Sequence, residues 1–72
     1  MPRATLTFQL SGTQVQGDLI EEFGRHDGVD ARATTVDGDV AIRVETGSSS
    51  AARWEVRATV GMFDDHAREI SQ

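Results

Sequence analysis

The segment ARATTVDGDVAIRVE, residues 31 to 45, constrains the fold more than any other part of this chain. At its centre stand Asp37 and Gly38, a residue pair that tolerates the positive φ angles of a tight hairpin turn. The runs on either side therefore read as two antiparallel strands. With a two-residue turn, Ala33 lies opposite Ile42 and Ala31 opposite Val44, so small residues face large ones on an inward side. The outward side of the same pairing carries Arg32, Thr34, Ala41 and Arg43.

A third strand is predicted near the beginning of the chain, in the segment ATLTFQL. Here Leu6, Phe8 and Leu10 alternate with polar residues, which is the period-two pattern of a strand with one buried face. Arg3, Thr5, Thr7 and Gln9 share the outward parity.

The segment SGTQVQGDLIEEFG, residues 11 to 24, favours a helix. Thr13 and Gln16 stand in the T-x-x-Q relation of a capping box, and Gly24 stands where a helix would end. Apolar residues recur every four positions and would line one side. The alternative is a β-hairpin turning at residues 11 and 12, because TQVQ also alternates, and Gly17 weakens a helix by roughly 1 kcal/mol relative to Ala.

A last helix is predicted from about Ala51 to Ile70, because the segment TGSSS before it offers several serine N-caps. At about 100° per residue, one stripe of apolar residues faces the sheet: Ala52, Val56, Val60, Phe63, Ala67 and Ile70. A second line lies on nearly the opposite side: Ala51, Trp54, Ala58, Gly61 and Met62. Because a surface helix is normally polar there, we interpret this line as a partner surface. The alternative is that Trp54 folds back over the sheet edge.

The predicted order is β-α-β-β-α, which makes residues 1–72 a single small α+β domain. A right-handed crossover leaves room for the third strand between the first two, giving a three-stranded antiparallel sheet with both helices on one face. This is a ferredoxin-like unit that lacks its last strand. The missing strand would leave an open edge, which predicts a dimer contact at Leu6, Thr7, Phe8, Gln9 and Leu10.

Composition narrows the possible functions. The 72 residues include no Cys, which excludes disulfides and thiolate metal sites. The net charge of −5 argues against non-specific nucleic-acid binding through a basic surface. All seven basic residues are Arg, and an acid-rich, lysine-free chain suits a high-salt cytoplasm or a GC-rich genome alike. No apolar run approaches the ~20 residues of a membrane span, so we expect a soluble cytoplasmic protein.

The triplet Asp64, Asp65 and His66 resembles a metal or acid/base site at first sight. On a helix, however, the three side chains diverge by about 100° each and cannot share one ion. Asp64 and Arg68 instead have the favourable i, i+4 order of acid before base. His26 lies in a loop without further ligands near it in sequence. Since phosphate-loop, nucleophile-elbow and thiol signatures are also missing, we predict no catalytic residue, no metal, no cofactor and no enzyme.

Arginines on the outward sheet face raise a second functional possibility. Two arginines directly opposite one another cost some stability, and an anion would offset that cost. Arg3, Arg32 and Arg43 are therefore candidate nucleic-acid contacts, which makes a small RNA-binding module the alternative function. The competing interpretation is an ordinary solvated face balanced by Asp30, Asp39 and Glu45.

With this order and the run GDVAIRVETGSSSAARWEVRATVGMFDDHAREI, the chain resembles the small dimerising subunit of the KEOPS (EKC) complex, the CTAG/LAGE family. The parts that carry the resemblance are the hairpin with Val36, Gly38, Ile42 and Val44, the Ser-rich bridge, and VRATV followed by a helix. The chain departs from the family in its short GRHDGV loop, in Gly61, and in Asp64 and Asp65, where apolar residues are usual. These departures leave open a paralogous subunit.

The resemblance implies a non-catalytic assembly subunit that supports tRNA threonylcarbamoyladenosine modification. Its partners would be the catalytic tRNA threonylcarbamoyl-transferase subunit and a second small subunit, either itself or a paralogue, with tRNA near it only indirectly. Carried over by position, the residues that meet the catalytic partner are Trp54, Arg57, Ala58, Gly61, Met62 and Asp65.

Overall fold

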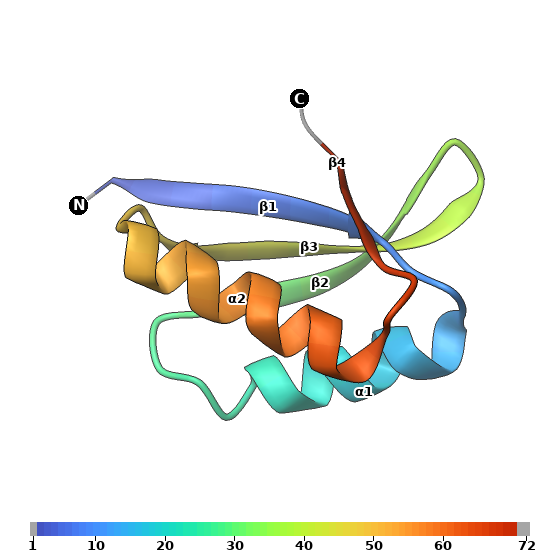
Figure 1. Cartoon of the computed structure of the whole chain (residues 1–72), viewed down its shortest axis with the longest axis horizontal. Helices are drawn as coiled ribbons and strands as arrows, with labels where there is room; N and C mark the ends of the chain where they lie inside the picture. Colours follow the sequence, from blue (N-terminus) through green and yellow to red (C-terminus); the bar gives the residue numbers. More distant parts are fainter. Residues whose placement is uncertain (1, 71–72) are drawn as a thin grey trace.

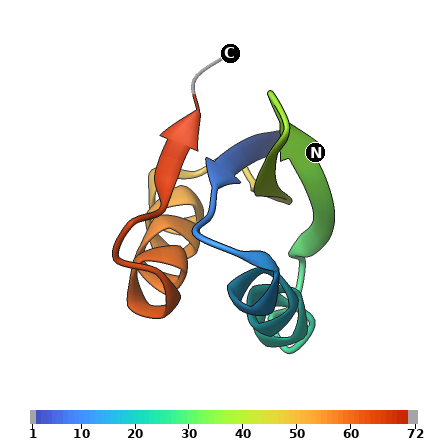
Figure 2. The ribbon, with the colours of Figure 1, turned by 90° about the vertical axis from the view of Figure 1, so that its right-hand side faces the viewer.

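The computed structural model describes residues 2–70, which form four strands and two helices. In chain order these are β1 (Arg3–Gln9), α1 (Thr13–Phe23), β2 (Asp30–Val36), β3 (Asp39–Gly47), α2 (Ser50–Phe63) and β4 (Arg68–Ile70). The strands form one antiparallel sheet in the order β2-β3-β1-β4. Both helices cover the same face of this sheet (Figures 1 and 2). The predicted α+β class is confirmed. Neither helix in the described part of the chain is long and apolar enough to cross a membrane.

The β2–β3 hairpin has the predicted turn and register. Ala33 is paired with Ile42, and Ala31 with Val44. The two turn residues have positive φ, 52° at Asp37 and 83° at Gly38, as a type I′ turn requires. This turn matches the twist of the strands that it joins, so it fixes which residues of the hairpin face the helices.

The core lies between the sheet and the two helices. Buried apolar side chains come from β1, α1, β3 and α2 and from the first residue after β1. They are Leu6, Phe8, Leu10, Leu19, Phe23, Ile42, Val44, Val56 and Val60. The apolar residues that alternate along the strands and those that recur every 3.6 residues along the helices therefore pack against one another. Ala41, predicted to face outward, is also buried, because β3 has neighbouring strands on both sides.

Residues 13–23 form a helix, so the hairpin alternative for this segment is wrong. The predicted capping box is also absent, since the N-cap is Gly12 and no side chain caps the helix. Instead, the Gln16 amide donates hydrogen bonds to the backbone carbonyls of Ala41 at 2.7 Å and Thr34 at 3.2 Å. The Gln16 side chain therefore joins α1 to the β2–β3 pair.

The predicted last helix ends early, at Phe63, and the chain then turns into β4. Asp64 has an extended backbone (φ −148°, ψ 101°), so the predicted helical pair of Asp64 with Arg68 does not exist. Aspartate competes with helical hydrogen bonds by accepting from nearby backbone N–H groups. Here the Asp64 carboxylate accepts from the N–H groups of Ser11 and His66.

β4 supplies the strand that the prediction left out, so the sheet has four strands and not three. Thr7 is paired with Ile70, Phe8 with Glu69 and Gln9 with Arg68. The edge predicted for a dimer contact, Leu6 to Leu10, therefore already has a neighbouring strand over three of its residues. β2 and β4 are now the outer strands of the sheet, at opposite edges (Figure 2).

Candidate protein-interaction surface

The orientation of α2 is fixed by its cap and by two buried residues. The Ser49 hydroxyl accepts a 3.1 Å hydrogen bond from the N–H of Ala52, so the helix begins at Ser50. Val56 and Val60 are each at most 2 % exposed and point into the core. Because these two residues are one helical turn apart, the residues about 180° away must point to solvent.

The solvent side of α2 is apolar, as the sequence predicts. Trp54 is 67 % exposed and Met62 is 83 % exposed. The Trp54 indole is thus on the surface and does not fold back over the sheet edge. We call this surface the α2 outer face, and it comprises Ala51, Trp54, Ala58, Gly61 and Met62.

In the middle of the α2 outer face, small side chains form a shallow depression between two large ones. Ala58 is half-buried, and a Cβ atom added at Gly61 would meet nothing within 4 Å. Phe63, predicted to be in the core, is 40 % exposed because it is the last residue of the helix. Small residues flanked by Trp54 and Met62 allow the axis of another helix to approach closely.

Arg57 has a structural partner within the domain. Its guanidinium forms two hydrogen bonds with the Glu69 carboxylate, of 2.6 Å and 3.1 Å, which connect α2 to β4. These hydrogen bonds raise the pKa of Arg57 and lower the pKa of Glu69, while partial burial opposes both shifts. Of the predicted partner contacts, Trp54, Ala58, Gly61 and Met62 lie on the α2 outer face. Arg57 is turned toward β4, and Asp65 is exposed beyond the end of the helix.

Asp64 has a structural role that the prediction of a continuous helix concealed. It is only 6 % exposed, and its two carboxylate oxygens accept N–H groups from Ser11 at 2.8 Å and His66 at 3.0 Å. Burial by itself raises the pKa of Asp64, but the two backbone hydrogen bonds outweigh it and hold the pKa below its ordinary value. Asp64 thereby fixes the position of the α2 C-terminus relative to the loop between β1 and α1.

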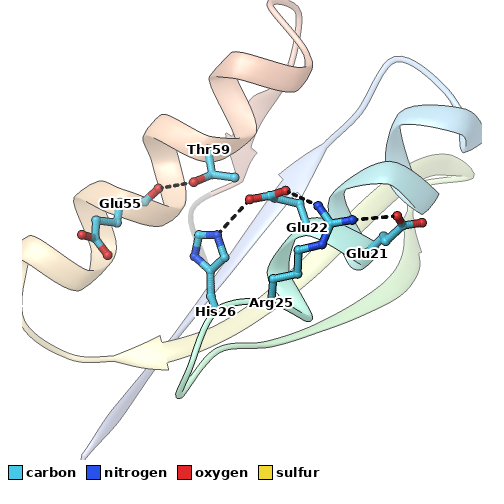
Figure 3. Close-up of polar contacts among 6 residues, drawn as sticks. All are labelled: Glu21, Glu22, Arg25, His26, Glu55 and Thr59. Carbon is cyan, nitrogen blue, oxygen red and sulfur yellow. Dashed lines mark hydrogen bonds and ion pairs between the residues drawn. The ribbon is translucent and has the colours of Figure 1, made fainter.

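Within residues 2–70, no group of three or more His, Asp or Glu side chains is placed so that it could hold a metal ion. His26 Nε2 lies 3.1 Å from a carboxylate oxygen of Glu22, and Arg25 binds both Glu21 and Glu22 (Figure 3). The His26 ring also contacts Phe23 edge to face, with ring centroids 5.7 Å apart. Through these contacts, His26 packs against the last turn of α1.

On the outer sheet face, the arginines have unequal surroundings. Arg3 lies 3.5 Å from Asp30 and 3.9 Å from Glu45, and it also donates to the carbonyls of Gly28 and Glu45. Arg32 and Arg43 are directly opposite one another, and neither has an acidic partner within 4.0 Å in residues 2–70. Of the three candidate nucleic-acid contacts, only Arg3 therefore has acidic neighbours within 4.0 Å in this part of the chain.

Comparisons of the chain with protein-family models, with curated proteins and with solved structures found no match. Inference about function therefore starts from the α2 outer face.

Proposed function

We propose that this protein is a non-catalytic assembly subunit of a KEOPS-type complex, which binds the catalytic tRNA threonylcarbamoyl-transferase subunit and a second small subunit. The observation that carries the proposal is the α2 outer face, with Trp54 67 % and Met62 83 % exposed on one helix. A single exposed apolar residue is ordinary, but a line of them along a helix is typical of a binding face. Trp is also enriched among the residues that dominate binding energy.

The α2 outer face is suited to receive a helix. Helices pack with axes 8–10 Å apart, and the side chains at the contact set the distance. Ala58 and Gly61 present almost no side chain at the centre, while Trp54 and Met62 flank them. The partner contact is therefore assigned to an amphipathic helix of the catalytic subunit, whose apolar side chains would fill this low centre.

Three sets of hydrogen bonds within the domain hold α2, and with it the α2 outer face, in position. The Ser49 cap fixes one end of α2, the Asp64 carboxylate fixes the other, and the Arg57–Glu69 pair secures the side next to β4. A surface that is already ordered loses little conformational entropy on binding, which favours its use as a docking face. The hairpin motif and the Ser-rich bridge, which resemble the KEOPS subunit, support the same assignment.

Co-purification with the catalytic subunit of the same organism tests the proposal. Ala58→Glu places a charge at the low centre of the face and is expected to abolish co-purification. Asp18→Ala alters an exposed residue of α1, outside the α2 outer face, and should leave co-purification unchanged. Circular dichroism verifies that both variants stay folded. Equal co-purification of the Ala58→Glu variant and the unaltered domain would contradict the proposal.

A further inference from the structure

The face of the sheet that the helices leave uncovered contains a shallow polar hollow. Both helices lie against the opposite face (Figure 2). The hollow has a volume of about 370 Å³, which is in the range of pockets that hold small ligands. We call it the outer hollow, and five residues line it: Thr5, Thr7, Arg43, Glu45 and Ile70.

One row of side chains crosses all four strands at the outer hollow. Arg32 of β2 is paired with Arg43 of β3, which is paired in turn with Thr7 of β1. Thr7 is then paired with Ile70 of β4. Residues paired in this way share one face of the sheet, with Cβ atoms about 5 Å apart. Because Thr7 is only 7 % exposed, it forms the floor of the hollow between two arginines on one side and an apolar side chain on the other.

Charge in and beside the outer hollow is unevenly balanced. The Glu45 carboxylate lies 3.9 Å from Nε of Arg3, which offsets its charge. Arg32 and Arg43 have no acidic group within 4.0 Å in residues 2–70. Like charges directly opposite one another destabilise a sheet. The free domain therefore carries two adjacent positive charges that an anion would neutralise.

We infer that the outer hollow binds a small phosphate monoester that also carries hydroxyl groups, of the class of sugar phosphates. The guanidinium groups of Arg32 and Arg43 bind the phosphate, whose oxygens match their paired N–H donors. The Thr7 hydroxyl donates to the same phosphate from below. On the other side of the hollow, the Glu45 carboxylate accepts from a ligand hydroxyl, and Ile70 contacts the carbon skeleton.

Charge and the placement of the aromatic residues favour this ligand over an RNA strand. A phosphate monoester carries a charge of about −1.5 to −2 at pH 7, which matches two guanidinium groups, whereas each phosphodiester carries only one charge. RNA strands also bind through bases stacked on aromatic side chains. Phe8 points into the core, and the other aromatic residues, Phe23, Trp54 and Phe63, belong to the helices. The uncovered face therefore offers phosphate contacts without a surface for bases.

This inference goes beyond the proposed function and does not depend on it. The α2 outer face points away from the sheet, because Val56 and Val60 on the other side of the helix are buried against the sheet. The outer hollow lies on the far face of the same sheet. A ligand in the hollow and a partner on α2 therefore occupy opposite sides of the domain.

Titrations followed by nuclear magnetic resonance test the ligand class with the purified domain. Ribose 5-phosphate should shift the amide signals of Thr5, Thr7 and Arg43 in a saturable way. Methyl phosphate and dimethyl phosphate are matched probes that differ in charge, and the diester should bind about tenfold more weakly or worse. The inference is overturned if ribose 5-phosphate gives no saturable shift, if the two methyl esters bind equally, or if an oligoribonucleotide without terminal phosphates binds more tightly than ribose 5-phosphate.

Variants of the lining residues test the assigned contacts. Arg32→Gln and Arg43→Gln should each weaken binding of ribose 5-phosphate by about tenfold or more. Arg25→Gln removes the same charge from the end of α1, on the helix side of the sheet, and should bind like the unaltered domain. Glu45→Ala should reduce the preference for ribose 5-phosphate over methyl phosphate. Circular dichroism verifies each fold, and equal weakening by Arg25→Gln and Arg43→Gln would refute a specific site.

Thermal denaturation provides an independent test. Because the two adjacent arginines repel one another, Arg43→Gln should raise the Tm of the free domain. Ribose 5-phosphate should raise the Tm of the unaltered domain, since a ligand that binds only the folded state stabilises it, and should leave the Tm of Arg43→Gln nearly unchanged. A lower Tm for free Arg43→Gln, or an equal rise of Tm in both proteins on adding the ligand, would contradict the inference.

Discussion

The Oδ2 atom of Asp64 accepts a 2.8 Å hydrogen bond from the backbone N–H of Ser11, across 53 residues of sequence. This bond joins the loop before α1 to the end of α2. Because Asp64 is buried, its replacement by Ala leaves the Ser11 N–H without its acceptor. We expect Asp64→Ala to lower the free energy of unfolding by about 1–3 kcal/mol, measured by urea denaturation. Asp65→Ala, at the exposed neighbour, should change it by less than about 0.5 kcal/mol, and equal losses from the two variants would refute the assignment.

Stability should depend on pH through the same carboxylate. The folded-state pKa values of Asp64 and Glu69 are lowered, so both groups contribute stability above their unfolded pKa values of about 3.9 and 4.3. That contribution is lost as pH falls from about 4 through the lowered folded-state values. Urea midpoints between pH 7 and pH 2.5 should therefore fall less steeply for Asp64→Asn than for the unaltered domain. An unchanged slope would show that Asp64 does not carry the effect.

The Arg57–Glu69 pair should hold β4 against β1. Replacing Arg57 by Ala removes both hydrogen bonds to Glu69, and we expect faster amide exchange at Thr7 and Ile70, by up to about fivefold. Amides of the β2–β3 hairpin should be unaffected, because the hydrogen bonds of Arg57 go to Glu69 of β4. Arg53→Ala, on the same helix, is the matched control. Exchange followed by nuclear magnetic resonance would contradict this role if Thr7 responded equally to both variants.

Substitutions of Gly61 should affect the stability of the domain and its binding to the partner in opposite ways. It is an exposed helical glycine with open space around it, so Gly61→Ala and Gly61→Leu should each stabilise the domain by about 0.5–1 kcal/mol. In the proposed contact, however, a leucine at this position would occupy the space that the partner helix takes up. We expect thermal denaturation to show stabilisation by both substitutions, and co-purification with the catalytic subunit to be lost for leucine alone. Undiminished binding of the leucine variant would remove Gly61 from the contact.

The hairpin and its register were predictable because local chemistry determines them. Asp37 and Gly38 set the turn, and alternation then places Ala33 against Ile42 without any knowledge of distant residues. The exposure of Trp54 was predictable for a similar reason, since helical periodicity from Val56 and Val60 places it on the opposite side. Both features depend on contacts between residues close in sequence.

The end of the chain was not predictable by the same means. Ala67, Arg68 and Glu69 are good helix formers, so local propensity continues the helix beyond Phe63. Two distant contacts decide otherwise, the Asp64 bond to Ser11 and the pairing of β4 with Thr7 to Gln9. The hydrogen bonds of Arg57 to Glu69 were not predictable either, because Glu69 comes within reach of Arg57 only when β4 has formed.

Calorimetric titration of the purified domain with the purified catalytic threonylcarbamoyl-transferase subunit tests the central claim most directly. Trp54→Ala should weaken binding by about 30-fold or more, since a Trp that acts as a binding hot spot contributes at least about 2 kcal/mol. Asp18→Ala, at an exposed residue of α1, should bind like the unaltered domain. The account is contradicted if the unaltered domain shows no heat of binding, or if Trp54→Ala binds as tightly as Asp18→Ala.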